Sequence, residues 1–182
     1  MGNNLLSAPT GKNEWYTPMR YFHMARFVMG SIDCDPASSD KAQKFVNAKQ
    51  YFTLENDGLL QEWKGNVWLN PPYSFPAIEK FSLKLLQEID NENTKQAIML
   101  TNASVDTKWF HSLLLYSSYI CLKKGRIAFF DSTGKTAGKS AHGSVFFYFG
   151  KNGHKFKNIF SHEGIIMLPE IMQIGLMTTT AN

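Results

Sequence analysis

The sequence predicts an α/β fold in which a mixed, mostly parallel sheet carries helices on both faces. Runs of strand length alternate with segments of helical spacing along most of the chain, which is typical of a doubly wound sheet. The runs Asn66–Asn70 and Gln96–Thr101 are apolar through their centres, as in parallel strands that are buried on both faces. Two later β-runs, Arg126–Phe130 and Ser144–Phe149, have no helix between them and predict an antiparallel hairpin at one edge of the sheet.

The individual elements follow from local signals in chain order. Thr17 before Pro18 predicts a helix start, with Thr17 as the cap and Pro18 in the first position, and Gly30 can close this helix. Further helices are expected from the turn Pro36–Asp40 through Val46, over Pro76–Ile89, where apolar residues keep helical spacing, and over Asp106–Tyr116. Further strands are expected at Ser31–Asp35, Gln50–Thr53, Tyr119–Leu122 and Ile165–Leu168.

Length and composition predict one folded domain with two loose ends. At 182 residues, with 43% hydrophobic residues, the chain can build one core but is too short for two full-sized domains. We expect a flexible arm at 1–13, a single domain at 14–168 and a frayed tail at 169–182. No signal peptide and no apolar run of membrane-spanning length is present, so we expect a cytoplasmic protein that contacts no membrane.

Charge and cysteine content narrow the possible partners. A net charge of +4 favours a polyanionic partner, although many soluble proteins carry such a charge without binding nucleic acid. Aromatic residues make up 14% of the chain and either fill the core or stack on bases. Cys34 and Cys121 lie far apart, and the histidines form no ligand-spaced cluster with them, so we expect buried thiols and no metal site.

The most informative stretch is the string Asn70-Pro71-Pro72-Tyr73, which follows the apolar run Val67–Leu69. Two prolines in a row end a strand and stiffen the turn that follows it. An amide, a backbone carbonyl and an aromatic ring are thus displayed at the carboxyl end of a strand, where open α/β sheets bind their ligands. A purely structural Pro-Pro turn is the alternative.

Two earlier segments carry candidate ligand-binding residues. Asp33 and Asp35, at the end of the first expected strand, would repel phosphate but suit a cation or hydroxyl groups. The alternative is that Asp35 belongs only to a capping turn. Trp15 and Tyr16 precede the first helix, where they either form a hydrophobic staple or contact a ligand.

The string Asn70-Pro71-Pro72-Tyr73 resembles the catalytic motif of S-adenosylmethionine-dependent amino-methyltransferases, above all the N6-adenine DNA methyltransferases. The wider chain resembles the small phage-type adenine methyltransferase family. The segments in common, in order, are Glu14–Pro18, Ile32–Ser38, Asp57–Leu59, Trp63–Tyr73, Lys108–Phe110, Gly125–Ile127 and Phe147–Gly150. The resemblance implies a Rossmann-like methyltransferase fold and site-specific transfer of a methyl group to the N6 amino group of adenine in DNA.

This chemistry suits the four residues of the motif. The Asn70 side-chain oxygen and the Pro71 carbonyl can accept the two N–H bonds of the adenine amine, drawing its lone pair out of the ring. Tyr73 can stack on the base, which must be flipped out of the duplex. Positioning and fixed dipoles then supply most of the rate, so no titrating residue is required. We therefore predict Asn70, Pro71, Pro72 and Tyr73 as the catalytic set.

The resemblance also implies S-adenosylmethionine as cofactor and S-adenosylhomocysteine as product. It places Trp15, Tyr16, Thr17 and Pro18 near the methionine end, where an aromatic face suits a sulfonium, and Asp57 near the cofactor's adenine amino group. The usual Gly-rich turn after the first strand is missing, so we rank Asp57 and Asp35 above Asp33. The predicted cofactor-binding residues are Trp15, Tyr16, Thr17, Pro18, Asp33, Asp35, Pro36, Ala37, Asp57 and Asn70.

Most of the residues predicted to contact DNA come after the motif in the sequence. Phe129 or Phe130 resembles the region where related enzymes stack a second aromatic on the flipped base, although core packing suits either ring equally. The connector 131–143 is rich in Gly, Ser and Lys and should be mobile, and its cations either meet phosphates or are solvated. The predicted substrate and DNA contacts are Tyr73, Arg126, Phe129, Phe130, Lys135, Lys139 and His142.

Several alternatives stay open at this stage. The motif can hold any planar amine or amide, so RNA, cytosine N4 or a protein amide are other substrates within its reach. A non-catalytic nucleic-acid-binding module is the rival from another class, and binding of S-adenosylmethionine distinguishes it from an enzyme. Because little of the chain is left over for recognition, we expect a short or relaxed target site, with a homodimer as one way to enlarge the DNA-binding surface.

Overall fold

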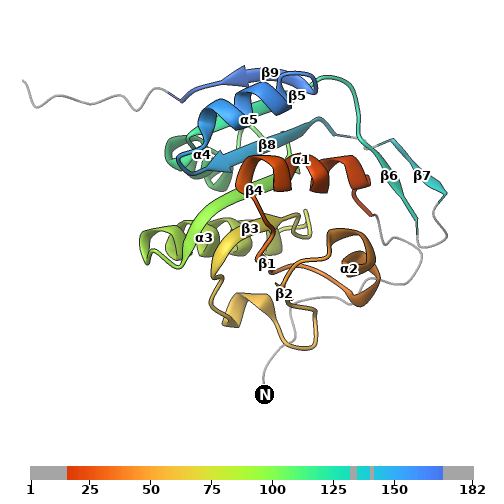
Figure 1. Ribbon diagram of the computed structural model, residues 1–182, viewed down its shortest axis with the longest axis vertical. Coiled ribbons are helices and arrows are strands. Elements are labelled where there is room, and N and C mark those ends of the chain that lie inside the picture. Colours follow the sequence, from red (N-terminus) through yellow and green to blue (C-terminus); the bar gives the residue numbers. More distant parts are fainter. Residues whose placement is uncertain (1–15, 132–134, 140–141, 170–182) are drawn as a thin grey trace, which may run out of the picture.

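The computed structural model describes residues 16–131, 135–139 and 142–169 (Figure 1). They form a seven-stranded sheet of order β2-β1-β3-β4-β8-β5-β9. The strands are β1 (Cys34–Asp35), β2 (Gln50–Tyr51), β3 (Gly65–Leu69), β4 (Thr94–Asn102), β5 (Tyr119–Lys123), β8 (Ser144–Phe149) and β9 (Gly164–Met167). The predicted arm 1–13 and all of the predicted tail except Pro169 lie outside the described residues.

The sheet is mixed, and most of its strands run the same way. The pairs β1–β2, β1–β3 and β3–β4 are parallel. Strand β8 is antiparallel to both β4 and β5, so β5 runs with β4, and β9 is antiparallel to β5. Strands β1 to β5 therefore share one direction, and their carboxyl ends open toward the same edge. This confirms the predicted mixed, mostly parallel sheet.

Helices cover both faces of the sheet, as predicted (Figure 1). On β4, Ile98 and Leu100 pack with one set of helices, while Ala97 and Met99 pack with the other, because successive residues of a strand point to opposite faces. One face carries α1 (Met19–Met29), α2 (Asp40–Val46) and α5 (Gly153–Phe160). The other face carries α3 (Ala77–Asp90) and α4 (Lys108–Tyr116).

The antiparallel hairpin exists, but its second strand is not the predicted one. Strand β6 (Ala128–Phe130) pairs with β7 (Thr136–Lys139) in a separate two-stranded sheet. The prediction that Ser144–Phe149 is the partner is wrong, because β8 lies inside the main sheet between β4 and β5. Every residue of β8 is buried, and such a strand needs neighbours on both sides and helices on both faces. The connector expected to be a loop also contains β7.

Two features of the chain ends were not predicted. Helix α5 connects β8 to β9, and its Phe156 and Phe160 rings stack at 4.4 Å in the core. Tyr16 forms a β-bridge with Phe130, in which each backbone N–H donates to the other residue's carbonyl, at 2.7 and 3.0 Å. These two hydrogen bonds join the segment before α1 to the β6–β7 hairpin.

The thiols agree with the expectation from composition. Cys34 and Cys121 are both free and buried, as predicted. Within the part of the chain that the structure describes, no helix is long and apolar enough to cross a membrane.

Candidate active site

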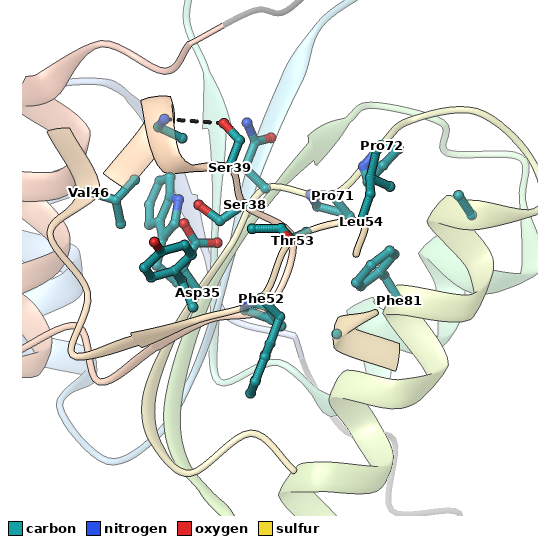
Figure 2. Close-up of a pocket in the computed structure, with 18 of the residues that line it drawn as sticks. Asp35, Ser38, Ser39, Val46, Phe52, Thr53, Leu54, Pro71, Pro72 and Phe81 are labelled. Atoms are coloured by element: carbon teal, nitrogen blue, oxygen red, sulfur yellow. Dashed lines mark hydrogen bonds between the residues drawn. The ribbon is translucent and has the colours of Figure 1, made fainter. Parts of the chain in front are cut away.

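The carboxyl ends of β1, β3 and β4 open into one cavity of about 1060 Å³. Pockets that hold a single small ligand usually measure about 300–1000 Å³, so this one has room for a cofactor and a second group. In Figure 2, Asp35 and Phe52 reach in from the β1–β2 side, and Pro71 and Pro72 lie opposite them. Most of the lining comes from Tyr16–Thr17, Asp35–Asp40, Tyr51–Gly58, Asn70–Ala77, Asn102, Phe129 and His142.

Asn70 sits directly after β3, and both polar atoms of its amide are engaged. Its Nδ2 donates to the Thr17 hydroxyl oxygen at 3.0 Å. Its Oδ1 accepts from the Tyr73 hydroxyl at 2.6 Å. The amide is therefore oriented with its oxygen toward Tyr73, and it lines the cavity. Thr17 was predicted as a helix cap, but α1 begins at Met19 after Pro18, and no side chain caps it.

Tyr73 occupies the hydrogen-bond acceptor that the predicted chemistry assigns to adenine. Its ring packs partly buried against the core cluster under α3. Burial raises the pKa of Tyr73 well above its ordinary value, so the hydroxyl is protonated and donates to Asn70.

Asp35, the last residue of β1, is a buried carboxylate at the cavity wall, with 3% of its surface exposed. Burial raises the pKa of Asp35 to about 7, although hydrogen bonds from Ser38, the Ala37 N–H and Gln43 oppose the shift. The Gln43 amide donates at 2.9 Å. All these partners are uncharged, so the carboxylate can still gain from hydroxyl donors of a ligand.

Asp57 is held at the cavity by close contact between its own turn and the turn after β1. It has a positive φ of 40° and caps the short 3-10 turn η1 (Gly58–Leu60) by accepting from the Leu59 N–H at 3.0 Å. At Gly58, an added Cβ would lie 1.9 Å from the Pro36 carbonyl oxygen. Only glycine therefore lets the Asp57 turn contact the turn after β1, and this contact brings Asp57 and Asp35 to one cavity.

Gly58→Ala should separate these two turns, because the new methyl group cannot fit against the Pro36 carbonyl. We expect a loss of stability of about 1–3 kcal/mol and weaker cofactor binding. Thermal unfolding and S-adenosylmethionine titration measure the two effects. Gly143→Ala is the control, since its Cβ would meet the nearest atom at 3.4 Å. Wild-type stability in the Gly58 variant would contradict the close approach.

Asp33 does not join the cavity. Its carboxylate forms an ion pair with Lys49 at 2.7 Å and accepts from the Asn66 N–H at 2.9 Å, beside a shallow second depression. Partial burial would raise the pKa of Asp33, but hydrogen bonds from Lys49, Asn66 and Ser31 outweigh it and hold the pKa below the ordinary value. Asp33 thus ties β1 to β3 structurally, and we leave it out of the proposed cofactor site.

The remaining predicted site residues divide between the cavity and its surroundings. Phe129 and His142 line the cavity, and Phe129, at 4% exposed, also belongs to the core. The residues outside the cavity lining are Pro18, Arg126, Phe130 and Lys135, of which Arg126 and Lys135 are exposed. Lys139 is the last residue of β7. Trp15 lies outside the described residues.

Two further lining residues were not predicted, although their positions at strand ends could have indicated them. Phe52 directly follows β2, and Asn102 is the last residue of β4. Both stand at carboxyl ends of parallel strands, the position from which Asn70 was selected.

The known proteins that this chain resembles share one description. A sequence model described as DNA N-6-adenine-methyltransferase (Dam) matches residues 7–175. A DNA N-6-adenine-methyltransferase of Haemophilus phage HP1 is 34% identical over 101 residues, which are 54% of this chain and 55% of that protein. A second protein of that name, from Escherichia phage T1, is 29% identical over 154 residues, or 75% of this chain and 62% of that protein.

The chain thus covers less than two thirds of the length of either of these relatives. The family match, in contrast, extends over nearly the whole chain, from the segment before α1 to beyond β9. On that match, the chain belongs to the DNA N-6-adenine-methyltransferase (Dam) family.

Proposed function

We propose that this protein transfers a methyl group from S-adenosylmethionine to the N6 amino group of adenine in DNA. The observation that carries the proposal is the Asn70 amide, which lines the cavity at the carboxyl end of β3, next to two prolines and Tyr73. Family membership and the names of the two phage relatives support the choice of adenine and DNA. Because both relatives come from phages, we propose that the enzyme acts in the cytoplasm of the host bacterium.

The residues of the cavity suit S-adenosylmethionine. The buried Asp35 carboxylate, whose hydrogen-bond partners are uncharged, is a fitting acceptor for the ribose hydroxyl groups. Asp57 can accept from the adenine amino group, and Phe52 offers an apolar wall in the same cavity. Tyr16 would line the methionine end. When bound, the cofactor supplies a methyl group on a sulfonium, which is activated for transfer.

In the proposed reaction, Asn70 Oδ1 and the Pro71 carbonyl accept the two N–H bonds of the adenine amine. These two acceptors pull the nitrogen toward tetrahedral geometry and free its lone pair for attack. Tyr73 leaves Asn70 and stacks on the flipped base. The nitrogen loses one proton to water after transfer, so no protein side chain has to titrate.

The β6–β7 hairpin is the proposed contact with the DNA backbone. It projects beside the start of α1 (Figure 1), and Lys135 lies in its turn with Arg126 just before β6. Exposed cations of this kind meet phosphates and add affinity without sequence preference. A homodimer stays a prediction.

Methyl transfer from tritiated S-adenosylmethionine tests this proposal. We expect saturable cofactor binding and label incorporated into double-stranded or single-stranded DNA but not into RNA. Binding of DNA without any cofactor binding would favour the non-catalytic module, and label in RNA alone would favour an RNA methyltransferase.

Cofactor affinity should depend on pH through Asp35. Donors from the ribose favour the ionised carboxylate, whose pKa in the free protein is about 7. We expect binding at pH 6 to be weaker than at pH 8 by about 10-fold, as the ionised fraction falls below its pKa. Isothermal titration across this range measures the effect. Asp35→Asn should bind weakly at every pH, and an unchanged pH profile in this variant would contradict the assignment.

The ionised Asp35 carboxylate should also lower the folding stability of the protein at high pH. Between its ordinary value of 3.8 and about 7, folded Asp35 binds more protons than unfolded Asp35, so stability falls as pH rises through that window. Relative to Asp35→Asn, the free energy of unfolding of the wild-type protein should fall by up to ~4 kcal/mol across this pH window. Thermal unfolding of the two proteins at pH 4.5, 6 and 8 checks the sign.

A further inference from the structure

We infer that Thr17 is a positioning residue for methyl transfer, which holds the Asn70 amide so that its oxygen faces the substrate. The Thr17 hydroxyl oxygen accepts the hydrogen bond from Asn70 Nδ2 at 3.0 Å. The two residues are 53 positions apart in the chain and meet only because the segment before α1 crosses the carboxyl end of β3. This inference rests on the proposed function.

The orientation of an asparagine amide decides what it offers a substrate. Its two ends are nearly equal in shape, but one accepts and the other donates hydrogen bonds. An adenine amine donates, so a flipped Asn70 would place its own N–H groups against those of the substrate. In the structure the Thr17 hydroxyl accepts from Nδ2, which leaves Oδ1 for the amine.

Tyr73 does not provide this restraint in the proposed reaction, because it leaves Asn70 to stack on the base. In the structure its hydroxyl donates to Oδ1 at 2.6 Å, the oxygen that is proposed to accept from the adenine amine. Once Tyr73 moves away to stack on the base, the Thr17 bond is the remaining side-chain hydrogen bond to Asn70 among the residues that the structure describes. Thr17 therefore acts when the amide is engaged with substrate.

Thr17 is itself fixed from both sides, as a positioning residue requires. Only 6% of its surface is exposed. On one side, Tyr16 is clamped to Phe130 by two backbone hydrogen bonds of 2.7 and 3.0 Å. On the other, Pro18 restricts the backbone with φ at −54° and leads into α1 at Met19. The oxygen that receives the Asn70 bond consequently has little freedom to move.

A positioning role and a cofactor contact by Thr17 predict different kinetics. If Thr17 only bound the methionine end of S-adenosylmethionine, its loss would raise the dissociation constant of the cofactor and spare the rate at saturation. If it positions Asn70, the rate at saturation falls while cofactor binding is retained. The expected loss of rate comes from misalignment of the reacting groups. A displacement of about 1 Å lowers the rate by on the order of 100-fold.

The test compares Thr17→Val, which keeps the shape but cannot accept a hydrogen bond, with Thr17→Ser, which keeps the hydroxyl. Single-turnover methylation of DNA is measured at saturating cofactor, and cofactor binding is titrated separately. We expect Thr17→Val to be about 10- to 100-fold slower with an unchanged cofactor dissociation constant, and Thr17→Ser to recover most of the rate.

Thr94→Val is the matched control for loss of a buried threonine hydroxyl. Thr94 is the first residue of β4, at the end of the strand away from the cavity. It is 5% exposed, and its hydroxyl donates to the Trp63 carbonyl at 2.8 Å. This variant should keep the wild-type single-turnover rate even if it unfolds at a lower temperature.

Three results would overturn the inference: a wild-type rate in Thr17→Val, a loss confined to the cofactor dissociation constant, or a folded Thr17→Ser as slow as Thr17→Val. If the wild-type protein itself methylates no adenine, the proposed function fails and the inference falls with it. The wild-type rate therefore separates that failure from the other three.

Discussion

Replacing Asn70 with alanine should abolish methyl transfer while leaving S-adenosylmethionine binding nearly intact. The Asn70 oxygen is one of two proposed acceptors for the adenine amine, and alanine has no group to take its place. Removing one preorganised hydrogen-bonding group from a reacting centre costs about 100- to 1000-fold in rate. The two quantities to compare are the single-turnover methylation rate and the cofactor dissociation constant of wild type and variant.

Asn66→Ala is the control for loss of an asparagine amide from the same strand. Asn66 lies at the opposite end of β3, where its Nδ2 donates to the Met29 carbonyl and to the Ser31 hydroxyl. This variant should lose stability and keep its methylation rate when folded. Near-normal turnover in Asn70→Ala would show that the chemistry is not carried by this amide.

Tyr73→Ala should lose activity through the base, whereas Tyr73→Phe should remain active. Stacking of one base on an aromatic ring contributes about 1–3 kcal/mol, equal to roughly 5- to 150-fold in kcat/KM for DNA. Phenylalanine keeps the ring and removes only the hydroxyl that occupies Asn70 Oδ1 before substrate binds. We therefore expect Tyr73→Phe to match or exceed wild-type activity.

Steady-state kinetics with a short duplex measures both Tyr73 variants. A phenylalanine variant as slow as the alanine variant would mean that the hydroxyl takes part in the reaction. That result would contradict the role given to Tyr73, in which its hydroxyl is a placeholder on Asn70 and its ring is the stacking partner.

Much of the site follows from the sequence because one rule connects strand order to ligand position. The strands that end at Asp35 and Asn70 were expected to be parallel, and parallel strands open at one edge, so both residues meet in the cavity. Asp33 shows where this reasoning stops. It lies two residues before Asp35, but its side chain is taken up by Lys49, just before β2, and by the Asn66 N–H of β3, two contacts that depend on how β1 aligns with its neighbours.

The hairpin partner and the role of Thr17 could not be predicted because both depend on contacts distant in sequence. Local pattern identifies β6 and β8 as strands but does not say which strand lies beside each, although the apolar residues on both faces of β8 favour an inner position. Thr17 before Pro18 has the form of a helix cap, yet its hydroxyl is used by Asn70 across the fold.

The most direct test of the central claim is the identity of the methylated nucleoside. DNA incubated with the protein and S-adenosylmethionine is digested to nucleosides and examined by mass spectrometry, with Asn70→Ala in parallel. We expect N6-methyldeoxyadenosine from the wild-type protein and none from the variant. N4-methyldeoxycytidine as the product, or equal N6-methyldeoxyadenosine from both proteins, would contradict the account.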